Sequence, residues 1–175
     1  MPDHAEAKET VHSLYAAGLH SAHAMEAQAK QLLRRQIERL GGYPELKSRL
    51  EQHLAETDKQ QERLDRILDS ISEPSSTIKD AASALLGNVA ATARMPAGDE
   101  VLKNSFASAA FENYEIAAYT SLIDLAQFAG ATDAVVLLRR SCEEEQAMAD
   151  WLASRLHNVT RQFVTQATGV APAAI

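Results

Sequence analysis

Apolar residues recur at spacings of three and four along most of the chain, which is the pattern of helices with one buried face. Clusters of Gly, Pro, Asp and Ser interrupt this pattern near residues 41–44, 73–76, 95–99 and 130–133. The interruptions divide the chain into five expected helices, at residues 4–40, 45–72, 77–93, 99–129 and 132–161. We expect residues 1–165 to form a single domain and residues 166–175, which are rich in small side chains, to form a flexible tail.

The lengths of the connections predict how these helices are arranged. About four residues join the first two long helices and about four join the last two, so each pair should form an antiparallel hairpin. The two hairpins are separated by about 26 residues that include the expected short helix. A 28-residue helix is about 42 Å long at ~1.5 Å per residue, and this connection is long enough to return along it. The expected fold is therefore all-α: a ferritin-like four-helix bundle of two antiparallel hairpins, joined by a long crossover containing a short helix.

Composition agrees with an all-helical chain and argues against several function classes. Only 7 of the 175 residues are Gly and 5 are Pro, and a single cysteine excludes both an internal disulfide framework and a multi-cysteine zinc site. The net charge of −7 disfavours binding to nucleic acid or to an anionic membrane, because both require positive charge. The sequence shows no signal-peptide pattern and no run of the ~18 apolar residues that a membrane-spanning helix needs, so we expect a cytoplasmic protein.

Acidic residues interrupt the apolar stripes at one level of the expected bundle. Each of the four long helices contributes one such residue: Glu26, Glu56, Glu115, and either Glu144 or Glu145. Counted from the hairpin turns, these acids lie roughly 18–23 Å from the hairpin ends, near the middle of the bundle. The two halves of the chain also correspond, because an offset of 89 residues carries Glu26 to Glu115, and an offset of 88 or 89 residues carries Glu56 to Glu144 or Glu145.

These acids point to a metal site. Ionised carboxylates in an apolar interior repel one another and lose their hydration, and cations would offset that cost. His53 and Glu112 lie on the same stripes, and oxygen-rich ligation with some imidazole suits iron or manganese. The familiar Glu-x-x-His motif of di-metal bundles is absent, because Lys59 follows Glu56 at that spacing. The sequence predicts a site for two iron or manganese ions per chain, with these candidate ligands: Glu26, His53, Glu56, Glu112, Glu115, Glu144 and Glu145.

Several runs resemble the YciE/YciF family of bacterial ferritin-like proteins. They are Tyr43-Pro44-Glu45-Leu46 leading to His53-Leu54-Ala55-Glu56-Thr57, and Phe111-Glu112-Asn113-Tyr114-Glu115-Ile116-Ala117-Ala118-Tyr119 followed by Glu143-Glu144-Glu145. The similarity covers about residues 10–160. The resemblance implies a rubrerythrin-like bundle, a homodimer, a di-metal site and an association with stress responses. Carried over by position, it implies as ligands Glu26, Glu56, Glu115 and Glu144, with His53 and Glu112 as second candidates.

Residues and resemblance together predict a carboxylate-bridged di-metal protein of the stress response, able to react with O₂ or peroxide. They assign no catalytic residue, no organic cofactor and no reaction. The alternative is a metal-free helical module for dimerisation or docking in the stress response, in which the acids line a water-filled seam. No feature of the sequence specifies a storage cage of the ferritin type.

Overall fold

The computed structural model describes residues 3–73 and 99–171, and within these ranges the chain forms four helices and no strand. The helices are α1 (His4–Ile37), α2 (Pro44–Ser70), α4 (Glu100–Phe128) and α5 (Thr132–Thr168). The predicted all-α bundle is confirmed. The short helix expected at residues 77–93 lies outside the described residues.

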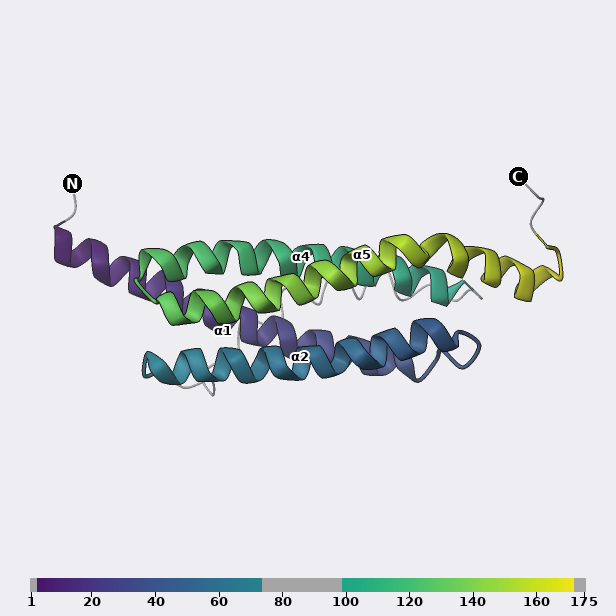
Figure 1. The fold of residues 1–175 in the computed structure, drawn as a ribbon, viewed down its shortest axis with the longest axis horizontal. Coiled ribbons are helices and arrows are strands. Elements are labelled where there is room, and N and C mark those ends of the chain that lie inside the picture. Colours follow the sequence, from purple (N-terminus) through teal and green to yellow (C-terminus); the bar gives the residue numbers. More distant parts are fainter. Residues whose placement is uncertain (1–2, 74–98, 172–175) are drawn as a thin grey trace.

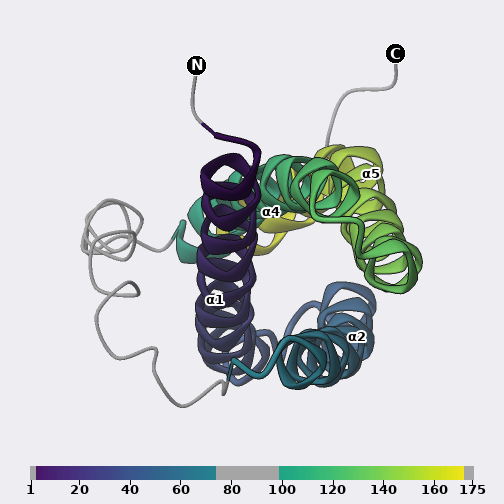
Figure 2. The same ribbon diagram turned by 90° about the vertical axis from the view of Figure 1, so that its left-hand side faces the viewer.

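The four helices lie side by side along one long axis (Figure 1). α1 and α2 run antiparallel, as do α4 and α5, and α4 starts at the same end of the bundle as α2. In the end-on view the order around the bundle is α1, α4, α5, α2 (Figure 2). This is the predicted arrangement of two antiparallel hairpins joined by a long crossover.

Local sequence signals explain where the helices begin and end. α2 starts with Pro44, whose fixed φ suits the first helical position and whose missing N–H is not needed there. Gly130 in the second hairpin turn and Gly169 after α5 both have a positive φ, a conformation that favours glycine. α5 continues to Thr168, beyond the expected end at residue 161, because no breaker interrupts the helix before Gly169.

The core consists of two apolar clusters separated along the bundle axis. One fills the end of the bundle that holds the second hairpin turn, with Leu19, Leu64 and Leu138 at its centre. The other fills the opposite end, around Leu50 and Leu152. Between them lies a layer of buried polar side chains from all four helices.

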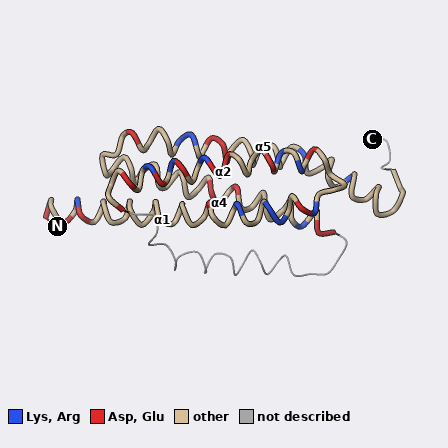
Figure 3. Tube along the Cα trace, turned by 90° about the horizontal axis from the view of Figure 1, so that it is seen from below, with Lys and Arg blue, Asp and Glu red and all other residues tan. Residues whose placement is uncertain are grey.

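No helix in the described ranges is both long and apolar enough to cross a membrane. Along the Cα trace, positions occupied by Lys, Arg, Asp and Glu are interspersed with uncharged stretches (Figure 3).

Candidate metal centre

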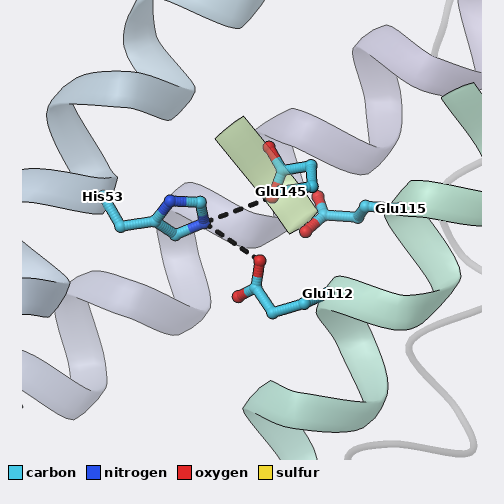
Figure 4. Close-up of side chains that lie close together, drawn as sticks. All are labelled: His53, Glu112, Glu115 and Glu145. Carbon is cyan, nitrogen blue, oxygen red and sulfur yellow. Dashed lines mark ion pairs between the residues drawn. The ribbon is translucent and has the colours of Figure 1, made fainter. Parts of the chain in front are cut away.

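Four buried side chains in the polar layer meet at one point. His53 of α2 points across the bundle toward Glu112 and Glu115 of α4 and Glu145 of α5 (Figure 4). Each of the four offers one ligand atom, and these atoms all lie within 4.8 Å of one another. At least about two and a half turns of helix separate this cluster from either end of the bundle, and an apolar cluster lies on each side of it along the bundle axis.

His53 is held by acids on both ring nitrogens. Its Nε2 lies 3.2 Å from Glu112 Oε2 and 3.4 Å from Glu145 Oε2, and its Nδ1 lies 3.0 Å from Glu56 Oε2. Burial on its own lowers the pKa of His53, but hydrogen bonds to Glu112, Glu145 and Glu56 outweigh it and raise the pKa to about 12. Without a metal, His53 is therefore an imidazolium that partly neutralises the acids. Its orientation, with Nε2 in the cluster and Nδ1 on a carboxylate, is also the one that metal-binding histidines adopt.

Glu26 of α1 brings a fifth group beside this cluster. Its side chain is fully buried, and the Tyr119 hydroxyl donates a 2.6 Å hydrogen bond to Oε1. Burial raises the pKa of Glu26 well above its ordinary value, and the charge of Glu145 raises it further. Burial likewise raises the pKa of Glu115, with the neighbouring Glu26 acting in the same direction.

Apart from Oε2 of Glu112 and of Glu145, which face His53 Nε2, three carboxylate oxygens in this layer are buried without a partner. They are Oε2 of Glu26 and both oxygens of Glu115. Buried polar atoms in native proteins are nearly always satisfied by a protein group, a water or an ion. A cation beside these oxygens would satisfy them and remove the repulsion among the acids. Carboxylate oxygens with one imidazole nitrogen form a donor set that fits iron or manganese.

The structure places the other two candidates, Glu56 and Glu144, at the flanks of the layer. Both side chains are 20% exposed, and each is held by an arginine. Arg49 lies 3.0 Å from Glu56, and the two terminal nitrogens of Arg63 lie 2.7 and 2.8 Å from the oxygens of Glu144. Burial alone raises the pKa of Glu56, but hydrogen bonds from His53 and Arg49 lower it to about 2. Of the adjacent pair left open by the sequence, Glu145 joins the cluster and Glu144 does not.

A repeat within the chain explains this placement. Buried positions on α2 recur on α5 at an offset of 88 residues, the separation of Glu56 and Glu144. The matching pairs are Leu46 with Ala134, Leu50 with Leu138, His53 with Ser141, Thr57 with Glu145, Gln60 with Met148, and Leu64 with Leu152. Glu56 and Glu144 are thus true counterparts, but they stand one residue away from the buried stripe.

Sequence reasoning overlooked Gln60, which is fully buried beside the cluster. Its amide nitrogen donates hydrogen bonds to Glu145 and, at 3.2 Å, to Glu144. The available signal was its position on the apolar stripe between His53 and Leu64. His23, the counterpart of Glu112 at the offset of 89, turns instead to Asp65, with Nε2 3.1 Å from the carboxylate.

Comparisons with known proteins agree with the fold. The family described as "Domain of unknown function (DUF892)" matches residues 10–165. A solved structure from Xanthomonas campestris pv. campestris is 29% identical, with a TM-score of 0.75 over 90% of this chain and 98% of that one. YcfI from Rhodopseudomonas palustris is 31% identical, with a TM-score of 0.72 over 82% of this chain and 92% of that one. The E. coli stress protein YciF is 25% identical, with a TM-score of 0.73 over 86% of this chain and 96% of that one.

Proposed function

The chain belongs to the DUF892 family, and to its YciF-like members, which confirms the resemblance predicted from the sequence; on this basis we propose that it is a ferritin-like protein that binds two iron or manganese ions in its core. The observation that carries the proposal is the set of buried carboxylate oxygens on Glu26 and Glu115 that lack a hydrogen-bond partner. Carboxylates buried in an apolar interior without a partner destabilise the folded state unless a ligand neutralises them. The ligands we propose are Glu26, His53, Glu112, Glu115 and Glu145.

The flanking residues have a different task, which is to position the ligands. Glu56 accepts a hydrogen bond from His53 Nδ1 and so directs Nε2 into the cluster. Arg63 fixes Glu144, and Gln60 bridges Glu144 and Glu145. Tyr119 holds Oε1 of Glu26 and leaves Oε2 free to bind. A bound pair of iron or manganese ions would supply redox chemistry toward O₂ or peroxide.

The biological setting follows from the relatives. E. coli YciF is a stress protein, and we propose that this chain also acts in a stress response, in the cytoplasm and as a homodimer. Gel filtration with light scattering tests the dimer directly. A mass of one chain, 19.0 kDa, contradicts it, and a mass of two chains supports it.

Elemental analysis of protein purified without chelator or histidine tag tests the metal proposal. We expect close to two iron or manganese atoms per chain. Glu115→Gln should lose metal because it removes a charge from the centre of the cluster, whereas Glu143→Gln, on the exposed face of α5, should retain it. Negligible metal after anaerobic loading with Fe(II) contradicts the proposal and favours the metal-free interaction module.

A further inference from the structure

The donor groups are distributed unevenly across the polar layer. On one side, His53, Glu112 and Glu145 converge, with the Nε2 of His53 within 3.4 Å of both carboxylates. Together with Glu115 they form a four-donor group whose ligand atoms lie within 4.8 Å of one another. This side therefore offers an imidazole nitrogen and three carboxylates to one ion.

The other side, next to Glu26, is poorer in donors. Glu26 lies outside the four-donor group found among the described residues, and one of its oxygens is already engaged by Tyr119 at 2.6 Å. Its electrostatic neighbours, Glu115 and Glu145, belong to the four-donor group as well. An ion bound by Glu26 must therefore share carboxylates with an ion bound by His53.

The repeat between the two hairpins shows which donors are missing. The counterpart of Glu145 on α2 is Thr57, a buried residue whose hydroxyl donates to the carbonyl oxygen of His53. The counterpart of Glu112 on α1 is His23, which is paired with Asp65 outside the layer. One half of the chain thus supplies three carboxylates to the layer, whereas the other supplies one carboxylate and one imidazole.

From this asymmetry we infer that the two ions bind unequally and in a fixed order. The first ion takes the position of His53, Glu112, Glu115 and Glu145. The second takes the position of Glu26 and depends on Glu115 and Glu145 as shared ligands. Loss of a residue that only orients a ligand weakens metal binding 10–100-fold, so absent ligands should make the second ion weaker by about tenfold or more. The inference rests on the proposed function, since it presupposes a site for two ions.

Titration of the metal-free protein with Mn(II), followed by electron paramagnetic resonance and calorimetry, tests the order of binding. Up to one equivalent, we expect the spectrum of isolated Mn(II) ions. Between one and two equivalents this spectrum should be replaced by that of a coupled pair. A coupled pair from the first addition, or two ions of equal affinity, overturns the inference but leaves the proposed function intact. Absence of any Mn(II) binding overturns both.

Two conservative variants separate the positions. Glu26→Gln should reduce the stoichiometry from two ions to one and leave the affinity of the first ion within about threefold, because all four of its ligands remain. His53→Gln should weaken the first ion by about tenfold or more, because it removes a ligand of the first position. Glu143→Gln is the matched control and should titrate like the unaltered protein. Equal losses of both ions in Glu26→Gln, with the helical circular dichroism signal retained, contradict the assigned order.

Discussion

The metal-free protein should become less stable as the pH rises from 5 toward 6.5. Glu26 and Glu115 are fully buried, and burial raises the pKa of each well above the 4.5 expected in the unfolded chain. Above pH 4.5 the unfolded chain releases both protons, whereas the folded chain retains them. An acid whose pKa is raised on folding thus adds a penalty that is absent below the unfolded-state pKa and grows with pH until the folded-state pKa is reached.

The size of the effect follows from the number of protons. Each proton that the folded state retains lowers the free energy of unfolding by about 1.4 kcal/mol per pH unit. Glu26 and Glu115 together therefore give a slope of up to about 3 kcal/mol per pH unit. Glu112, whose pKa is raised by burial to about 7, acts in the same direction. His53 acts in the same direction near pH 6.5, because an ordinary histidine with a pKa of 6.5 is half deprotonated there whereas His53 of the folded chain keeps its proton.

Urea unfolding in the presence of a chelator, followed by circular dichroism at several pH values between 5 and 6.5, measures this slope. Glu115→Gln removes one of the retained protons, so its slope should be smaller by about 1.4 kcal/mol per pH unit. Glu143→Gln should leave the slope unchanged. A stability that stays constant or rises over this window, or a Glu115→Gln variant with the parental slope, refutes the argument that these acids are protonated in the folded metal-free protein.

Three further changes test the surroundings of the cluster. Glu56→Gln removes the carboxylate that orients His53, so the affinity for Mn(II), measured by calorimetry, should fall about 10–100-fold while the helical content stays constant. Tyr119→Phe removes a buried hydrogen bond to Glu26 and should lower the free energy of unfolding by about 1 kcal/mol in urea titrations of the metal-free protein. Leu64→Ala empties a fully buried position in the apolar cluster and should cost about 2–5 kcal/mol in the same assay, without changing the metal stoichiometry.

The sequence predicts the fold well because the signals for it are redundant. Each long helix carries many apolar positions, so an error at one of them does not alter the predicted stripe. The lengths of the connections then leave few ways to arrange four helices. Helix ends depend on single residues and are less predictable, as α5 shows by continuing to Thr168.

Predicting the site residues requires the rotation of each helix as well as the depth of each residue along the bundle. Depth follows from counting residues and identifies the level of Glu26 and Glu115, both of which are buried. The rotation of a helix about its own axis does not follow from counting residues to this precision, because successive residues are separated by about 100° around that axis. Glu144 and Glu145 lie at nearly the same depth, and only the stripe through Leu138, Ser141 and Met148 distinguishes them. The partner of Glu144, Arg63, is far away in the sequence and comes beside it only in the folded bundle.

The two halves of the bundle differ where they face the cluster and are alike at its flanks. Glu56 and Glu144 are counterparts in the repeat, equally exposed and each paired with an arginine. Each also accepts a hydrogen bond from the residue four positions earlier, Gln52 in one case and Arg140 in the other. One residue further inward the counterparts are Thr57 and Glu145, a hydroxyl against a carboxylate. The asymmetry of the donor set therefore coincides with different side chains at matched positions of the repeat on α2 and α5.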